Sequence, residues 1–175
     1  MRIDKMKKFA IFGFIILALT FSAFGQKKTT VKVDPTKDVR AVFDRLVEGI
    51  KQSDAAKVMG VYNKSEDILF FNNNGSVTRG WEMMKTNREA SYKNATNVTL
   101  ETTGVKIEIL GNTAAYLTCK WKQTQEYNGK LETASGRMTL VFRLIGKEWK
   151  VVHLHTSPDN PDATRPVLDN ERIKQ

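Results

Sequence analysis

Two histidines stand one residue apart near the end of the chain, in the stretch KEWKVVHLHTS at residues 147–157. They are the only histidines in the sequence. Side chains two residues apart on a strand point to the same face, so His153 and His155 would act on one side of a sheet. Imidazoles placed in this way can bind a metal, transfer a proton, contact a ligand or hydrogen-bond at a structural edge.

A metal site is the least supported of these interpretations. A stable site needs three or four ligands, whereas the chain has no third histidine and a single cysteine, Cys119. We therefore predict no metal and no cofactor. A structural role at a strand end or a dimer seam is the favoured interpretation of the two histidines, and contact with a ligand is the alternative. Cys119 lies in an alternating run, which predicts a buried thiol.

The N-terminal pattern is typical of a secretory signal peptide. A basic segment, MRIDKMKK, precedes the apolar run FAIFGFIILALTF and the small-residue segment SAFG, which predicts cleavage after Gly25. The apolar run is shorter than the roughly 18 to 20 residues that a membrane span needs, although a retained anchor is the alternative. We expect export to a bacterial periplasm or beyond, with no membrane attachment after cleavage.

The rest of the 175-residue chain fits one domain, at residues 34–158, between a disordered linker (26–33) and a polar tail (159–175). The formal charge of +9 comes from lysines and arginines spread along the chain, which argues against a nucleic-acid partner. Asp34 and Pro35 are an N-cap and a first helical residue. They predict a helix with this apolar stripe: Val39, Val42, Phe43, Leu46, Val47 and Ile50.

Further elements follow from local patterns. Asp54 predicts the start of a second, short helix that runs toward Tyr62. DILFF, NNNG and SVTRG predict a strand, a turn and a returning strand, and WEMMKTNREASYK predicts a third helix. Alternating runs at 98–110, 113–127, 131–145 and 148–156, joined by GN, NG and GK, predict an antiparallel meander with a bulge at Gly104. The fold class is therefore α+β.

Lysines and arginines indicate which face of each strand meets solvent. The inner face then carries Trp121, Phe142 and Trp149 and, by simple alternation, both histidines. Val152 and Leu154 make the other face of the last strand apolar too. A strand that is apolar on both faces is often covered on both, which favours a partner subunit.

These elements together resemble the nuclear transport factor 2-like superfamily, and within it the SnoaL-like group. The chain is also similar to the association domain of calcium/calmodulin-dependent kinase. The resemblance covers residues 36–158, and its most specific parts are RGWEMM and the W-x-x-V-H-x-H-x-S ending. It implies a cone-shaped fold in which three N-terminal helices pack on a curved antiparallel sheet around a pocket. It also implies a homodimer through the outer face of the sheet.

The resemblance implies little acid–base chemistry at the positions that match. Ketosteroid isomerases of the superfamily place a tyrosine where this chain has Leu46, and an aspartate base where it has Phe71 or Asn72. Asn72 cannot accept a proton at neutral pH. The SnoaL-like polyketide cyclases also depend on a pocket acid, so the same objection applies to them.

The kinase association domain lines its pocket with arginines that bind anions. The matching positions here are Trp121, Thr139 or a neighbour, and Thr156, so these arginines are absent. The same register places Thr156 inside and the two histidines outside, which is the reverse of simple alternation. A bulge in the last strand would reconcile the two.

We therefore expect an exported protein that binds a small, largely apolar molecule in the pocket, with no catalytic residue assigned. One alternative is a homodimeric oligomerisation or protein-interaction module. A second is an isomerase- or cyclase-type enzyme that uses a pocket histidine. Trp81 and Trp121 are candidate pocket walls, with plain core packing as the favoured alternative. Tyr62 is a candidate for the pocket mouth, and the alternative is a helix-end residue with its hydroxyl in water. The candidate ligand-binding residues are Tyr62, Asn72, Trp81, Trp121, His153 and His155.

Overall fold

The computed structural model of the protein describes residues 34–159. The predicted signal peptide, the predicted linker and the predicted tail beyond Asp159 lie outside these residues. Within residues 34–159, no helix is both long enough and apolar enough to cross a membrane.

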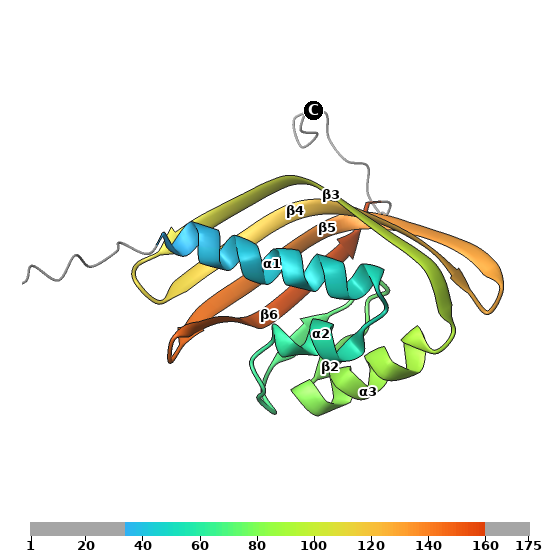
Figure 1. Ribbon diagram of the computed structural model, residues 1–175, viewed down its shortest axis with the longest axis horizontal. Helices are drawn as coiled ribbons and strands as arrows, with labels where there is room; N and C mark the ends of the chain where they lie inside the picture. The colour runs from blue at the N-terminus through green and yellow to red at the C-terminus, as the bar shows by residue number, and fades with distance from the viewer. Residues whose placement is uncertain (1–33, 160–175) are drawn as a thin grey trace, which may run out of the picture. The chain divides into compact units, whose positions relative to one another are not determined.

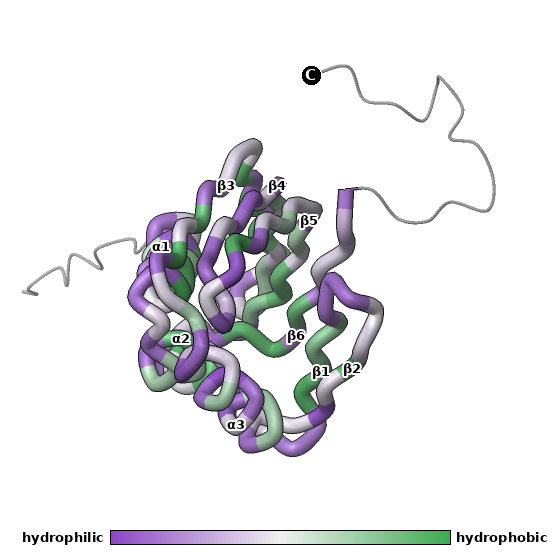
Figure 2. Tube along the Cα trace, turned by 90° about the vertical axis from the view of Figure 1, so that its right-hand side faces the viewer, coloured by the Kyte–Doolittle hydropathy of each residue, from purple (hydrophilic) through white to green (hydrophobic). Residues whose placement is uncertain are grey.

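The described chain forms three helices and one six-stranded sheet, which confirms the α+β class (Figure 1). The strand order in the sheet is β2-β1-β6-β5-β4-β3. The helices lie on one side of the sheet, as the side view shows (Figure 2). The elements are α1 (Pro35–Lys51), α2 (Ala55–Gly60), β1 (Leu69–Phe71), β2 (Val77–Arg79), α3 (Trp81–Tyr92), β3 (Ala95–Leu110), β4 (Ala114–Tyr127), β5 (Lys130–Ile145) and β6 (Glu148–Pro158).

The sheet is mixed, which corrects the expectation of a wholly antiparallel one. The β3–β6 meander is antiparallel throughout, but β1 pairs with β6 in parallel, with Phe70 opposite Leu154. The chain passes through α3 and four further strands, β2 to β5, between β1 and β6. It returns beside β1 in the same direction, and tertiary packing decides this pairing. No local sequence pattern predicts this parallel pairing.

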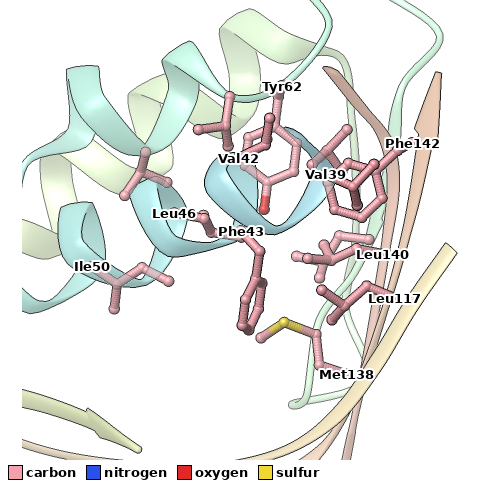
Figure 3. Packing of buried hydrophobic residues seen from close by; sticks show 14 of the residues in the cluster. Val39, Val42, Phe43, Leu46, Ile50, Tyr62, Leu117, Met138, Leu140 and Phe142 are labelled. Atoms are coloured by element: carbon pink, nitrogen blue, oxygen red, sulfur yellow. The ribbon is translucent and has the colours of Figure 1, made fainter. Parts of the chain in front are cut away.

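α1 begins and packs as the sequence predicts. The Asp34 carboxylate accepts a hydrogen bond from the Thr36 backbone N–H at 3.1 Å, and Pro35 occupies the first turn, where its missing N–H costs nothing. Most of the apolar stripe is buried, and Phe43 is directed toward Met138 on the sheet (Figure 3). Burying each large apolar side chain contributes about 1.5–3 kcal/mol.

α2 follows at once because Asp54 caps it, accepting from the Lys57 backbone N–H at 2.9 Å. Gly49 allows α1 and α2 to approach closely, since a Cβ there would lie 3.0 Å from the Val58 side chain. This contact fixes the end of α1 against the start of α2.

The long strands are interrupted where the sequence indicates. Gly104 has φ +62°, and the β3–β4 register shifts between Thr103 and Lys106, so the predicted bulge is confirmed. A second shift lies between Thr96 and Thr99. Figure 1 shows β3 arching along the sheet and bending toward α3, which gives the sheet its curvature.

A bulge in β6 settles the orientation of the histidines. The β5–β6 register passes from Val141 opposite His153 to Phe142 opposite Val151, which leaves Val152 without a partner. The strand therefore changes face, so that Val151 and Leu154 are both buried. Placing the histidines inside by simple alternation is thus wrong. They lie on the outer face, opposite Val141 and Thr139.

Gly136 is required by close approach of the chain. It is buried on β5 opposite Pro158, and an added Cβ would collide with the Ser157 carbonyl. We expect Gly136→Ala to lower the free energy of unfolding by about 1–3 kcal/mol, because the strands must move apart. Urea denaturation measures this.

Gly60→Ala is the matched control, because no atom lies within 4 Å of a Cβ added there. This residue is helical and exposed, so alanine should be neutral or stabilising by up to about 1 kcal/mol. Equal losses in the two variants would contradict the close-approach explanation.

Candidate functional site

A cavity of about 690 Å³ lies between the C-terminal half of α1, the end of α3 and the inner faces of β4 and β5. Its lining combines an apolar wall with polar side chains near the β1–β2 turn and the β4–β5 hairpin. The apolar members are Leu46, Ile50, Leu100, Trp121, Ala134, Met138 and Leu154, and the others are Tyr62, Asn72, Asn73, Asn74, Arg88, Ser91, Tyr92, Gln123, Gln125, Tyr127, Glu132, Thr133 and Thr156.

Trp121 forms part of the apolar wall. It is buried, and its indole Nε1–H donates to the Arg137 carbonyl at 3.2 Å on the neighbouring strand. Its cross-strand partner is Gly136, which has no side chain to compete for that space. The indole is therefore fixed in orientation, with both a buried apolar surface and a satisfied N–H.

The β4–β5 wall becomes polar toward the hairpin. Gln123 donates through Nε2 to Gln125 Oε1 at 2.8 Å, and Gln125 donates through Nε2 to Glu132 Oε2 at 3.3 Å. Glu132 is exposed and is the one carboxylate among the described lining residues. The inner-face assignment for these strands overlooked it.

Arg88 and Tyr92 bring a positive charge and a phenol from α3. The Arg88 Cζ lies 6.0 Å from the centroid of the Tyr92 ring. The Tyr92 hydroxyl is buried without a hydrogen-bond partner among the described residues. Burial raises the pKa of Tyr92. Arg88 offsets part of that rise through its charge and through a side-chain contact with the hydroxyl that falls short of regular hydrogen-bond geometry. At neutral pH the phenol is therefore protonated and able to donate.

Tyr62 reaches the cavity from the end of α2. Its side chain is buried, and its ring meets Phe70 edge-to-face with centroids 5.0 Å apart. Figure 3 shows its hydroxyl oxygen directed into the interior beside α1. Burial raises the pKa of Tyr62 to about 12, with Arg88 lowering it slightly and Tyr92 raising it. This phenol is also a donor at neutral pH.

Asn72 lies at the end of β1, where the turn to β2 meets the cavity. Its Nδ2 donates to Ser76 Oγ at 3.1 Å and to Thr78 Oγ1 at 3.2 Å, so the turn holds the amide in place. Tyr62, Asn72 and Trp121, all predicted as ligand-binding residues, thus lie on one cavity.

The other three predicted site residues lie elsewhere. Trp81 does not line the cavity: its Nε1–H donates to the Met59 carbonyl at 2.9 Å, and Lys64 and Lys85 lie over its ring. It joins α3 to α2. His153 and His155 stand on the outer face of the sheet against Phe71, so neither can act as a base in this cavity.

The described residues contain no group of three or more histidine, cysteine, aspartate or glutamate side chains placed to hold a metal. Burial of the Cys119 thiol raises its pKa to about 11. The thiol is therefore protonated at neutral pH.

Sequence reasoning missed Arg88, Tyr92, Tyr127 and Glu132. The cation comes from α3 and not from the positions of Trp121 and Thr156, where similarity to the kinase association domain would place arginines. A partial signal existed for α3, because Arg88 and Tyr92 are four residues apart and therefore share a helix face.

The raised pKa of Tyr62 predicts a loss of stability at high pH. The folded pKa of about 12 exceeds the unfolded value near 10. The stabilisation is therefore complete below pH 10 and is lost as pH rises from about 10 to 12, at up to about 1.4 kcal/mol per pH unit.

Urea denaturation at several alkaline pH values should show a shallower loss in Tyr62→Phe than in the unsubstituted protein. The Cys119 thiol also has a raised pKa, so its titration causes a loss of stability that begins at a lower pH. The Tyr62→Phe variant retains this contribution. An unchanged slope in Tyr62→Phe would show that the Tyr62 hydroxyl titrates alike in both states.

Comparison with known proteins agrees with this fold. A nuclear transport factor 2-like superfamily protein from Salmonella enterica serovar Typhimurium is 22% identical, with a TM-score of 0.65, covering 73% of this chain and 93% of that chain. A candidate dehydratase of the same family from Streptomyces avermitilis is 17% identical, with a TM-score of 0.65 and coverage of 73% and 97%.

A candidate calcium/calmodulin-dependent protein kinase II association domain from Xanthomonas campestris is 19% identical, with a TM-score of 0.61 and coverage of 73% and 89%. Likeness at these identities establishes the fold alone. No curated protein matches the chain significantly. The SnoaL-like domain family matches residues 39–161, which include most of the described structure, and the chain belongs to that family.

Proposed function

We propose that this protein binds a small amphipathic molecule in the cavity between α1, α3 and the β4–β5 hairpin. One observation carries the proposal: the cavity holds about 690 Å³ and joins an apolar wall to convergent polar groups. Small-molecule sites are typically concave, about 300–1,000 Å³ in volume, mostly apolar, and carry a few polar groups that fix orientation.

The lining supports a more polar ligand than the largely apolar one predicted from sequence. Leu46, Leu100 and Trp121 offer an apolar surface. Gln123, further along β4, and Arg88 on α3 offer hydrogen-bonding groups. A molecule with an apolar body and one polar end would match both.

Binding, and not proton transfer, is the role that the described lining supports best. Its one carboxylate, Glu132, is exposed at the hairpin, and the phenols of Tyr62 and Tyr92 keep their protons at neutral pH. The proposal retains export, as predicted from residues 1–25. N-terminal sequencing after expression in a bacterial host tests that part separately, with Gln26 expected as the first residue.

Filling the cavity should abolish binding. Gln123→Trp places a large ring in the cavity, and we expect at least a tenfold loss of affinity for octanamide and 2-naphthamide, two small neutral molecules. Isothermal titration calorimetry measures both.

Lys122→Trp is the matched control, because Lys122 is exposed and neighbouring side chains on β4 point to opposite faces. It should bind as the unsubstituted protein does. Equal binding by Gln123→Trp and the unsubstituted protein would place the ligand outside this cavity.

A second function, homodimerisation through the outer face of the sheet, is favoured by an uncharged patch there. Two rows of side chains cross four strands in register and include no charged residue. We call them the outer patch: Leu69, His153, Val141 and Tyr116 in one row, and Phe71, His155, Thr139 and Thr118 in the other.

The outer patch suits a second copy of this chain. Phe71 meets both histidine rings edge-to-face, at centroid distances of 5.2 Å to His153 and 5.6 Å to His155. No described helix covers this side of the sheet (Figure 2). Because the chain carries a formal charge of +9, two copies would meet most readily where neither presents a charge.

Val141→Lys introduces a charge at the centre of the outer patch and should convert a dimer to a monomer. Leu131→Lys is the control, because Leu131 is 73% exposed near the β4–β5 turn, away from the patch. Sedimentation velocity distinguishes the two states. A monomeric unsubstituted protein, or a Val141→Lys variant that stays dimeric, would contradict this assignment.

A further inference from the structure

Arg88 is the one positive charge on the cavity lining, and it has no carboxylate partner among residues 34–159. Two other cations that contact α3 do have partners: Lys85 pairs with Glu89 at 3.5 Å and Lys64 with Glu82 at 2.9 Å. Arg88 is half-buried beside the cavity. A guanidinium held there without a counter-charge is a binding group for an anion.

The Tyr92 hydroxyl is a second polar group beside the cavity whose hydrogen-bonding capacity is not satisfied. It is buried, and its contact with Arg88 does not have the geometry of a regular hydrogen bond, nor does its contact with any other described residue. An unsatisfied buried polar group costs about 1–3 kcal/mol. An acceptor atom on a ligand would remove that cost while pairing with the guanidinium.

The one carboxylate on the described lining, Glu132, forms no ion pair with Arg88. Glu132 is exposed and accepts a hydrogen bond from Gln125. The apolar side chains Leu46, Leu100 and Met138 also line the cavity.

The number of charges selects the chemical class of the anion. One guanidinium and one hydroxyl present donors that match the two oxygens and single negative charge of a carboxylate. A phosphate monoester would bring close to two charges and three acceptor oxygens, for which the described lining has no second cation.

We propose that the cavity binds a small amphipathic carboxylate, whose anionic group contacts Arg88 and Tyr92 and whose apolar part lies against Leu46, Leu100 and Trp121. This inference rests on the proposed binding function and specifies its ligand class.

The test compares molecules that differ only in charge. Octanoate and octanamide form one pair, and 2-naphthoate and 2-naphthamide form another, each titrated calorimetrically into the unsubstituted protein. We expect each carboxylate to bind at least tenfold more tightly than its amide, because hydrogen bonds to charged groups contribute more than neutral ones.

Arg88→Gln should erase that preference, reducing carboxylate affinity at least tenfold and amide affinity less than twofold. Lys85→Gln is the matched control: it removes one charge from the same helix, outside the cavity, and should keep the preference. Tyr92→Phe should weaken carboxylate binding more than amide binding, because the hydroxyl's bond to a charged acceptor is the stronger one. Amide binding also confirms that each variant is folded.

Equal binding of the two members of each pair would overturn the proposal while leaving the proposed binding function intact. An equal loss in Lys85→Gln and Arg88→Gln would also overturn it, because the effect would then reflect net charge. If neither member of either pair binds the unsubstituted protein, both the ligand class and the proposed function are wrong for this cavity.

Discussion

The cavity exists because the helix that covers the sheet is about half as long as the strands beneath it. α1 has 17 residues, so it spans about 25 Å. β5 has 16 residues, which extend over about 50 Å. The first turns of α1 pack on one half of the concave face, where Val39 and Phe43 are fully buried. The other half is bordered by the end of α1 and by α3, and the space between them is the cavity.

The same difference in length explains why the inward side chains along a strand change from apolar to polar. On β4, inward residues from Ala115 to Cys119 lie under α1 and are apolar, whereas Gln123 and Gln125 line the uncovered half. Trp121 stands at the boundary, with its ring in the wall and its N–H bonded to the next strand. The change from apolar to polar along one strand face therefore follows the change from packed core to cavity.

Most of the fold could be predicted from local patterns. Caps at Asp34 and Asp54, alternation in four strands and the bulge at Gly104 each rest on residues close together in the sequence. The parallel pairing of β1 with β6 depends on residues far apart, and no local pattern contains it. The β6 bulge is intermediate, because alternation and the family register disagreed there and only pairing with β5 decided between them.

The candidate site was less predictable for a related reason. Asn72 and Trp121 were found because they match pocket positions of the families that the chain resembles, and Tyr62 because it carries a hydroxyl at the end of the second helix. Arg88 and Tyr92 sit on a helix with a weak apolar stripe, and Glu132 lies near a hairpin turn. Their proximity to the cavity arises from how α3 and the hairpin pack, which the residue types alone do not determine.

The two irregularities of β3 bear on how this protein avoids uncontrolled association. β3 is the terminal strand of the sheet, so one side of a 16-residue strand has no neighbour within residues 34–159. Register shifts at Thr96–Thr99 and Thr103–Lys106 break its row of free backbone groups into short segments. Exposed charges at Glu101, Lys106 and Glu108 oppose the approach of another strand. Fibril-like growth by addition of a strand at this edge is thereby discouraged.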